Sequence, residues 1–418
     1  MFAGATSERI GSPANHLDGP NGSSTASRLD RPLRRWTING DFLGLKSTGL
    51  ARFAREITLA LDALIADGHP LTHDLSVDIV APKQPREPLS LRYIDMRIVP
   101  DLRPRLPQVW VQFQLPRQVK RGGLLSFCNL APIFVDRHIA CVHDLQTRLT
   151  PDSYGFLFRL VHNVLLPRIG RRADVITTVS DFSKANLIRF GIADAEKIAV
   201  VHNGADHALR WRMSDAARSW STGRPFVLCI GRNETHKNMR LVWNLARRLD
   251  ALDIDIVVAG DIDPAQLDRG TSGRPRNLRC LGRVSDGDLA RGFSEALCFL
   301  FPSRTEGFGL PAVEAMSCGC PVIASTSPCL PEICGNAALF ADPDDETAWV
   351  RAVERLLKTP KLSQSLREAG LARANHFTWR ATAIKYLDLM MRVDRGRSLS
   401  ADGKMPASVT PRSETSSW

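Results

Sequence analysis

Two glutamates with seven residues between them flank a glycine-containing loop in the second half of the chain. Glu306 precedes Gly307-Phe308-Gly309, and Glu314 falls in the first turn of a helix predicted to begin at Pro311. The free N–H groups and the positive dipole end of such a helix suit a diphosphate, and glycines let a ligand approach the main chain closely. The alternative is structural: Glu314 complements the helix dipole, and Glu306 is a solvated loop acid.

Further charged residues lie where short apolar strands are predicted to end. His143 and Asp144 follow the apolar run His-Ile-Ala-Cys-Val, while Arg232 and Lys237 follow Phe-Val-Leu-Cys-Ile-Gly. Side chains at the carboxyl end of a parallel strand face the edge of the sheet at which ligands bind. A lone histidine is often a structural residue whose hydrogen bonds are made within the protein. Arg232 and Lys237 could likewise be solvent-exposed residues at the start of a helix.

Short apolar strands alternate with helical segments along most of the chain, which predicts parallel sheets covered by helices. The alternation runs twice, and a polar stretch ending in Thr-Gly-Arg-Pro separates the two runs. The predicted fold class is α/β, with two Rossmann-like domains facing across a cleft. The predicted parts are a tail at 1–33, an N-terminal domain at 34–207, a linker at 208–224, a C-terminal domain at 225–376, a final helix at 377–393 and a tail at 394–418.

The composition is typical of a water-soluble globular protein. Of the 418 residues, 44% are hydrophobic and 24% charged, and no apolar run reaches the roughly 18 residues of a membrane-spanning helix. The N-terminus has no apolar core of a secretory signal, so we expect a cytosolic protein. The nine cysteines are expected to be reduced, and Cys318 and Cys320 have no second Cys/His cluster with which to bind zinc.

The net charge of +11 favours an anionic partner, which can be nucleic acid, an anionic membrane face or a phosphorylated substrate. Residues 102–121 hold five arginines and lysines and no acid, interleaved with Trp110 and Phe113. A basic, aromatic surface of this kind suits a membrane interface. A solvated basic face over an ordinary core helix explains the pattern equally well.

The stretch from Glu306 to Glu314, Glu-Gly-Phe-Gly-Leu-Pro-Ala-Val-Glu, resembles the E-x7-E motif of the retaining, GT-B-fold glycosyltransferases of family four. Other stretches are similar to landmarks of that family in the same order, namely 47–54, the His143-Asp144 pair, 180–187 and 202–206. The similarity spans about residues 35 to 391. A series of ordered motifs makes it more specific than one glycine loop.

The resemblance implies roles for the loop residues. By it, Glu314 hydrogen-bonds the ribose of a nucleotide and Glu306 contacts the transferred sugar. The backbone amides of Phe308, Gly309 and Leu310 hold sugar hydroxyls and phosphate.

The same resemblance implies roles for the other candidates. Arg232 and Lys237 match the two cations that bind the diphosphate, and Gly49 approaches it through its backbone N–H. His143 orients a hydroxyl of the donor sugar near the anomeric carbon, with Asp144 beside it as a further catalytic candidate. Many relatives read Pro-Arg-Lys-Asn where this chain has Thr-His-Lys-Asn, which leaves the role of His236 open.

The implied reaction transfers a hexose with retention and without a protein nucleophile, and it needs no metal and no cofactor beyond a GDP- or UDP-sugar. The chain looks most like enzymes of bacterial polysaccharide assembly, so GDP-mannose is the expected donor, with glucose, galactose and rhamnose as alternatives. The expected acceptor is a lipid-linked oligosaccharide at the cytoplasmic face of the inner membrane. No nucleic-acid partner is expected, and the final helix resembles one that crosses back onto the N-terminal domain.

Two other classes stay open at this point. A nucleotide-sugar epimerase of the same architecture needs no acceptor. A non-enzymatic basic protein that binds membrane or nucleic acid explains the charge but not the spacing of the charged candidates. Asp261-Ile262-Asp263 follows an apolar strand and could hold a metal. The chain contains three other Asp-x-Asp triplets, however, so we interpret this one as a chance occurrence.

Overall fold

The computed structural model describes residues 34–396, except for 47, 102–106, 120–121, 214–219, 221–222, 264, 266–272 and 274. The described residues belong to one compact unit that begins at Arg34. The predicted tail at 1–33 lies outside them, as do the predicted C-terminal tail from residue 397 onward and much of the predicted linker. The division into domains therefore stays a prediction.

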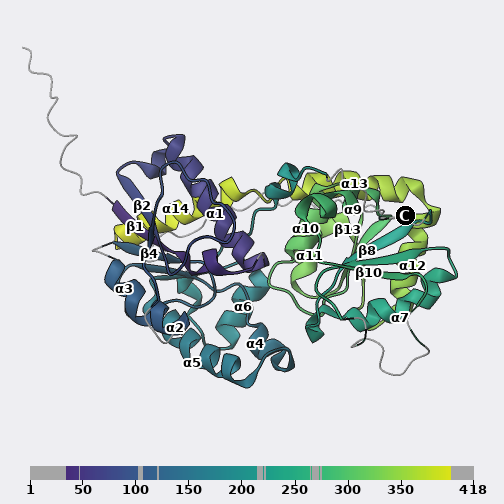
Figure 1. The fold of residues 1–418 in the computed structure, drawn as a ribbon, viewed down its shortest axis with the longest axis horizontal. Helices are drawn as coiled ribbons and strands as arrows, with labels where there is room; N and C mark the ends of the chain where they lie inside the picture. The colour runs from purple at the N-terminus through teal and green to yellow at the C-terminus, as the bar shows by residue number, and fades with distance from the viewer. Residues whose placement is uncertain are drawn as a thin grey trace, which may run out of the picture. The chain divides into compact units, whose positions relative to one another are not determined.

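Seven parallel strands from the first half of the chain form one sheet, in the order β3-β2-β1-β4-β5-β6-β7 (Figure 1). All residues of β4, β5 and β6 are buried, as expected for strands in a parallel sheet with both faces covered. The strands are β1 (Arg34–Asn39), β2 (Leu75–Ala81), β3 (Asp95–Ile98), β4 (Gly123–Ser126), β5 (His138–Cys141), β6 (Val175–Thr178) and β7 (Ile198–Val200).

Six parallel strands from the second half form another sheet, in the order β10-β9-β8-β11-β12-β13. The strands are β8 (Phe226–Ile230), β9 (Asp255–Ala259), β10 (Leu278–Gly282), β11 (Cys298–Phe301), β12 (Val322–Ser325) and β13 (Ala338–Ala341). The predicted α/β class with two parallel sheets is confirmed.

Helices and short turns connect the strands. In the first half the helices are α1 (Gly49–Ala66), α2 (Pro107–Val109), α3 (Leu115–Gln118), α4 (Gln146–Leu149), α5 (Phe156–Arg172) and α6 (Asp181–Arg189). In the second half they are α7 (Met239–Asp250), α9 (Asp286–Glu295), α10 (Leu310–Ser317), α11 (Cys329–Cys334), α12 (Glu346–Lys358), α13 (Pro360–Ala374) and α14 (Trp379–Asp394). The shorter turns are η1 (Gly40–Gly44), η2 (Pro70–Thr72), the π-helical η3 (Trp110–Gln114), η4 (Pro151–Ser153), η5 (Ala195–Lys197), η6 (Asp206–Arg210), η7 (Thr235–Lys237) and η8 (Gly335–Ala337).

The strand order reverses once in each sheet, between β1 and β4 in the first and between β8 and β11 in the second. At such a point the loops at the carboxyl ends of the two strands run in opposite directions and leave a crevice where ligands bind. The loops after β1 and β4 therefore border one expected binding crevice. The loops after β8 and β11 border another.

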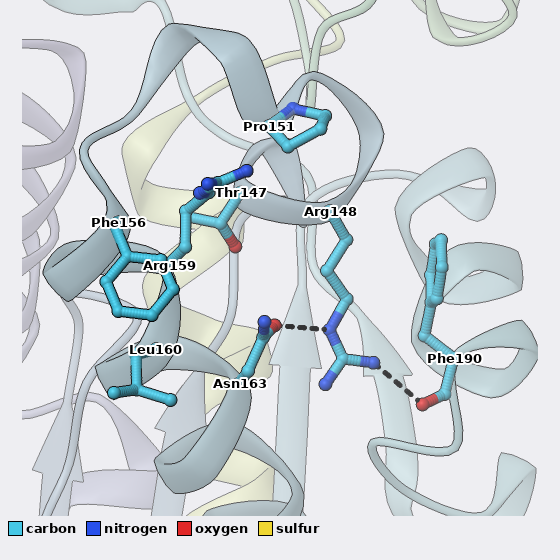
Figure 2. A pocket seen from close by; sticks show the side chains of 8 residues that line it. All are labelled: Thr147, Arg148, Pro151, Phe156, Arg159, Leu160, Asn163 and Phe190. Carbon is cyan, nitrogen blue, oxygen red and sulfur yellow. Dashed lines mark hydrogen bonds between the residues drawn. The ribbon is translucent and has the colours of Figure 1, made fainter.

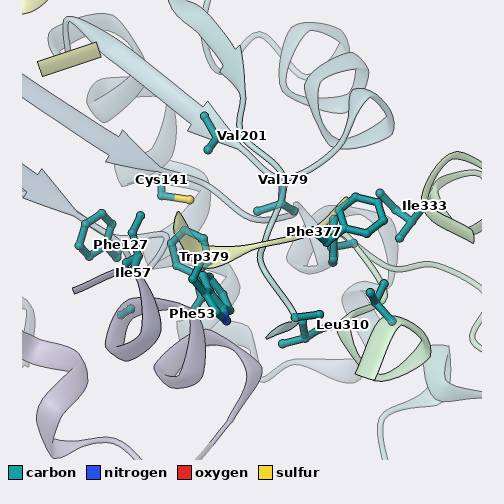
Figure 3. Packing of buried hydrophobic residues seen from close by; sticks show 14 of the residues in the cluster. Phe53, Ile57, Phe127, Cys141, Val179, Val201, Leu310, Ile333, Phe377 and Trp379 are labelled. Carbon is teal, nitrogen blue, oxygen red and sulfur yellow. The ribbon is translucent and has the colours of Figure 1, made fainter. Parts of the chain in front are cut away.

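Buried aromatic and aliphatic side chains from both halves of the chain form one continuous cluster (Figure 3). The rings of Phe53 and Trp379 have centroids 5.7 Å apart, and those of Phe308 and Phe377 are 5.4 Å apart. The segment that leads into α14 therefore joins the core beneath the first sheet to the core around α10.

The last helix, α14, packs on the first sheet, where it contacts α1 and β5 (Figure 1). Tyr386 Oη lies 2.6 Å from Thr177 Oγ1, so the helix is hydrogen-bonded to strand β6. At the end of α14, Asp394 accepts hydrogen bonds from the side chains of Arg34 and Trp36 on β1. The C-terminal helix thus completes the layer that covers the N-terminal sheet.

Trp110 does not lie on the exposed basic surface expected for residues 102–121. Its side chain is 1% exposed and donates Nε1–H to the carbonyl of Val99 at 2.8 Å, because its ring fills the core against Val80 and Leu124. Of the side chains expected on that surface, Phe113 is exposed. Four of the expected cations lie outside the described residues, namely Arg103, Arg105, Lys120 and Arg121.

Candidate active site

A cavity of about 310 Å³, here called the donor cavity, lies at the reversal point of the second sheet. The loops after β8 and β11, the N-terminus of α1 and the loop after β5 line it. All ten residues predicted from the sequence to form a site are on its wall, namely Gly49, His143, Asp144, Arg232, Lys237, Glu306, Phe308, Gly309, Leu310 and Glu314. The structure therefore brings the whole predicted set together, whereas their individual roles stay predictions.

Two glycines shape the loop that leads into α10. Gly309 caps the helix at φ +92°, a conformation that side chains disfavour, and a Cβ there would lie 2.6 Å from Leu330 Cδ2. A Cβ on Gly307 would lie 2.7 Å from the carbonyl oxygen of His143. The loop therefore needs glycine at both positions, once for backbone conformation and once for close contact with the loop after β5.

The predicted cations and the first glutamate form ion pairs at the mouth of this loop. Lys237 Nζ lies 2.6 Å from Glu306 Oε1 and also 5.9 Å from the ring centroid of Phe301. Arg232 is more exposed and lies 3.7 Å from Glu234. A diphosphate that entered the cavity would meet the guanidinium group of Arg232 and the ammonium group of Lys237, each of which is paired with one carboxylate.

The Thr-His-Lys-Asn turn departs from the family pattern without displacing Lys237. It forms η7, and Asn238 ends it at φ +55°, a region that asparagine tolerates better than most residues. His236 is 5% exposed, and burial lowers its pKa, so the ring is neutral and packs inward. The structure thus gives His236 a place in the protein interior.

The second glutamate is buried and already has two partners. Glu314 is 6% exposed, and its Oε1 lies 2.9 Å from His207 Nε2 and 3.9 Å from Arg52 Nε. Trp379 donates Nε1–H to His207 Nδ1 at 3.0 Å, so His207 carries its own proton on Nε2 and donates it to Glu314. Arg52 also forms a bidentate pair with Asp286, at 2.6 and 2.9 Å.

Arg52 and His207 were not predicted as site residues. Arg52 lies inside the motif quoted for the first helix, three residues after Gly49, and it lines the donor cavity. Its partner Asp286 is 234 residues away in the sequence, so no local spacing could indicate the pair. His207 directly follows the landmark at 202–206, but only the fold shows that it faces Glu314.

His143 is 7% exposed and its ring is held by protein groups. Nε2 lies 2.8 Å from the carbonyl oxygen of Phe127, so this nitrogen is the donor, and the ring stands edge-on to Phe53 at 4.5 Å. Cys141, at the end of β5, also interacts with this ring. Burial lowers the pKa of His143, but Cys141, the Phe127 carbonyl and Asp144 raise it by more, to about 8. Orienting a sugar hydroxyl through Nε2, the role predicted for His143, requires the bond to Phe127 to be exchanged for one to the hydroxyl.

The N-terminus of α1 opens into the cavity. Thr48 caps it, its Oγ1 accepting a hydrogen bond from Ala51 N at 3.3 Å. Among the described residues, no atom outside the adjoining backbone lies within 4 Å of the place where a Cβ on Gly49 would stand, so packing against them does not require glycine there. The free space beside Gly49 instead leaves its main chain accessible to a ligand.

Hydrogen bonds tie α6 of the first half to the loop and helix beside α10. Ser180 Oγ donates to the carbonyl of Gly307 at 2.6 Å, and Ser183 Oγ donates to it at 3.3 Å. Glu332 of α11 accepts from the first backbone N–H of α6, at 2.9 Å, and so caps that helix from the other half of the chain. These bonds hold the loop of Glu306 against the first sheet.

Within the described residues, no three His, Cys, Asp or Glu side chains gather so that they could hold a metal ion. Asp261, the first residue of the Asp-x-Asp triplet considered above, pairs with Arg283 at 3.2 Å. The expectation that the reaction needs no metal stays a prediction. In the same part of the chain, no helix is long and apolar enough to cross a membrane.

Two parallel α/β sheets with a cavity at the reversal point of the second define the class of GT-B glycosyltransferases. Sucrose-phosphate synthase from Thermosynechococcus elongatus shares this fold, with a TM-score of 0.65 and 19% identity over 87% of this chain and 100% of that one. Residues 48–209 match the family model described as Glycosyltransferase Family 4, and residues 214–373 match Glycosyl transferases group 1.

Two curated relatives are each 30% identical to the chain. O-antigen chain mannosyltransferase B of Escherichia coli matches over 270 residues, 59% of this chain and 68% of the relative. GDP-mannose:cellobiosyl-diphosphopolyprenol alpha-mannosyltransferase of Komagataeibacter xylinus matches over 228 residues, 52% of this chain and 56% of the relative. The chain belongs to the family 4 glycosyltransferases and is a hexosyltransferase. This membership decides against the epimerase and the non-enzymatic alternatives.

Proposed function

We propose that the chain transfers mannose from GDP-mannose, with retention of the anomeric configuration, to a growing and lipid-linked polysaccharide. The observation that carries the proposal is the gathering of all ten predicted site residues on one cavity, next to an accessible helix N-terminus. The mannosyltransferase relatives support mannose as the transferred sugar. The donor named for the relative from Komagataeibacter xylinus supports guanine as the base of the donor nucleotide.

In the proposed reaction the acceptor oxygen forms a bond to the anomeric carbon on the face from which the diphosphate leaves. The bond from that carbon to the β-phosphate oxygen breaks, and the acceptor proton passes to this oxygen. Arg232, Lys237 and the N-terminus of α1 stabilise the negative charge on the departing diphosphate. The protein supplies positions and charges and no nucleophile.

In the proposed function, two sets of ion pairs hold the side chains of the site ready for the donor. Lys237 exchanges part of its contact with Glu306 for phosphate, which frees Glu306 to accept hydrogen bonds from the sugar. Glu314 keeps His207 and Arg52 on Oε1 and offers its remaining acceptor capacity to the ribose. Both carboxylates are thus held in place before the donor arrives.

The test uses the full chain with GDP-mannose, UDP-glucose or UDP-galactose, EDTA, and methyl α-D-mannoside as acceptor. We expect GDP to be released from GDP-mannose, faster with acceptor than without it, and the new sugar to be α-linked by proton NMR. A β-linked product would contradict retention. Release from a UDP-sugar alone would overturn the choice of donor.

A peripheral membrane contact forms a further part of the proposed function. Helix α5 exposes an apolar patch, defined as Phe156, Leu157, Leu160 and Val164, between 41% and 72% exposed. All charged residues of α5 are arginines. A hollow of about 450 Å³ beside the patch is lined by Phe156, Leu160, Arg148 and Arg159 (Figure 2). Apolar side chains and arginines on one helix favour insertion among anionic lipid headgroups.

Sedimentation with vesicles tests this contact. We expect the protein to pellet with phosphatidylglycerol vesicles at low salt, and Phe156→Ser with Leu157→Ser to reduce the bound fraction severalfold. Leu371→Ser, which changes an exposed leucine of α13, is the matched control and should bind normally. Binding of the double variant at the unaltered level would contradict the contact.

A further inference from the structure

A second cavity, of about 480 Å³ and here called the acceptor cavity, lies at the reversal point of the first sheet. Asp41 and Gly44 of η1 line it from the loop after β1, and Asn129 lines it from the loop after β4. A crevice in this position is a ligand site in open α/β sheets. The acceptor cavity shares Leu50 and Asp144 with the donor cavity, so the two cavities adjoin each other.

Three buried oxygens on the wall of this cavity have no hydrogen-bond donor among the described residues. They are Asp41 Oδ1, Asp101 Oδ1 and Gln108 Oε1. A buried polar group without a partner destabilises the folded protein, and a ligand that supplies the partner removes that cost. Gln108 Oε1 and the oxygens of ionised Asp41 and Asp101 are acceptors, so a ligand that satisfies them must bring several donors, such as hydroxyl groups.

An aromatic wall faces the same space. Tyr154 and Phe158 are stacked, with ring centroids 5.5 Å apart and planes 13° apart, and Phe158 lies 4.0 Å from the ring of His162. Phe158 and His162 are one turn apart on α5, and Tyr154 lies in the extended segment just before that helix. All three line the acceptor cavity. Aromatic walls with a few convergent polar atoms are typical of sites for small organic ligands.

The charge on the wall opposes an anionic ligand. Its described residues include the carboxyl groups of Asp41, Asp101 and Asp144 against the single ammonium group of Lys83. Burial raises the pKa of Asp41 to about 7, outweighing the opposite effect of the neighbouring Asn39 and Phe42. The surroundings thus already disfavour negative charge, and a carboxylate or phosphate on the ligand would add more.

We propose that the acceptor cavity binds the terminal sugar of the acceptor and selects a neutral hexose over a uronic acid or a phosphorylated sugar. The sugar ring lies against Tyr154 and Phe158, and its hydroxyls donate to Asp41 and Gln108. Asp144, on the wall of both cavities, lies where the reacting hydroxyl passes toward the anomeric carbon of the donor. This inference rests on the proposed function, because it names the acceptor of that reaction.

Saturation-transfer NMR on the full chain with saturating GDP tests the inference. The probes are methyl α-D-mannoside and methyl α-D-mannuronate, which differ only at carbon 6. We expect saturation transfer to the neutral glycoside and a signal at least about fivefold weaker for the anionic one. Equal signals for the two glycosides, or none for the neutral one, would overturn the proposal.

A pair of variants locates the binding. Gln108→Leu removes one unpaired oxygen and should raise the dissociation constant for methyl α-D-mannoside at least about tenfold, while the affinity for GDP stays the same. Gln118→Leu makes the same change in α3, ten residues along and away from the cavity, and should leave both affinities unchanged. An unchanged glycoside affinity in Gln108→Leu, or an equal loss in Gln118→Leu, would overturn the assignment.

Competition separates this inference from the proposed function. If GDP-mannose displaced the glycoside and GDP did not, the acceptor cavity would hold the donor sugar and the inference would fail. If the glycoside bound but calorimetry showed no binding of GDP or GDP-mannose, the proposed donor would fail and the sugar site would stand. Glycoside binding that persists with GDP-mannose present supports both.

Discussion

At the scale of single residues, the candidate site consists of charged groups that neutralise one another until a ligand arrives. Lys237 pairs with Glu306, and Glu314 pairs with His207 and Arg52. Buried or half-buried charges are stable only when paired, so the protein can hold these side chains in place without a donor. The donor then replaces or shares partners that are already positioned.

Lys237→Met tests this arrangement. It removes one cation facing the departing diphosphate, so we expect kcat to fall by about 10²–10³-fold, the usual effect of losing one transition-state partner. Steady-state kinetics with GDP-mannose measures the change. Lys358→Met, at an exposed position of α12, controls for the loss of a positive charge. A fall of less than about threefold for Lys237→Met would remove this lysine from the proposed chemistry.

Asp41 gives a pH-dependent prediction. Burial raises its pKa from 3.8 to about 7, so the folded state holds this proton more tightly than the unfolded state. Its contribution to stability is therefore full below about pH 4 and is lost as pH rises through 7. Asp41→Asn removes that loss, and the melting temperature of the variant minus that of the wild type should increase from pH 4 to pH 8.

Differential scanning calorimetry at several pH values measures this difference. Asp67→Asn, an exposed aspartate just after α1, controls for the removal of one negative charge. A difference between Asp41→Asn and the wild type that stays constant with pH would contradict the assigned shift.

At the scale of elements, two glycines in the donor cavity are required for different reasons. The main chain of Gly307 touches the loop after β5, whereas the space beside Gly49 is empty. We expect Gly307→Ala to lower both the melting temperature and the activity, because its Cβ would stand 2.7 Å from a carbonyl oxygen. Gly49→Ala should keep the melting temperature within a few degrees but weaken GDP binding about tenfold or more.

Thermal melting and calorimetric titration with GDP separate the two effects. Equal losses of stability in both variants would mean that Gly49 is also a packing residue. Unaltered GDP binding by Gly49→Ala would show that the diphosphate does not approach the N-terminus of α1.

The elements also show how far the sequence could predict the fold. Strands β8 and β9 have four and five buried residues in a row between clear turn signals, and they were predicted. Strands β3, β4, β7 and β13 were missed, because each has only three or four residues and lacks a long apolar run that would distinguish a strand from a loop. Trp110 was misplaced, because sequence alone does not show that a tryptophan between basic residues faces the core.

At the scale of the whole molecule, the site depends on contacts between distant parts of the chain. Each motif could be predicted because its residues are close in sequence and follow a strand. The Arg52–Asp286 and His207–Glu314 pairs could not, because their members lie 234 and 107 residues apart. The acceptor cavity could not be predicted for the same reason, because residues from η1, the loop after β4 and the start of α5 line it.

The most direct test of the proposed function is the thermal stability of the full chain with GDP, UDP, ADP or dTDP in the presence of EDTA. Ligand at about 100 times its Kd adds about 2.7 kcal/mol to the free energy of unfolding, a shift that is easily measured. We predict a clear rise in melting temperature with GDP alone, and none with GDP for Lys237→Met. No rise with any nucleotide, or an equal rise in the variant, would contradict a metal-free nucleotide-sugar site in the donor cavity.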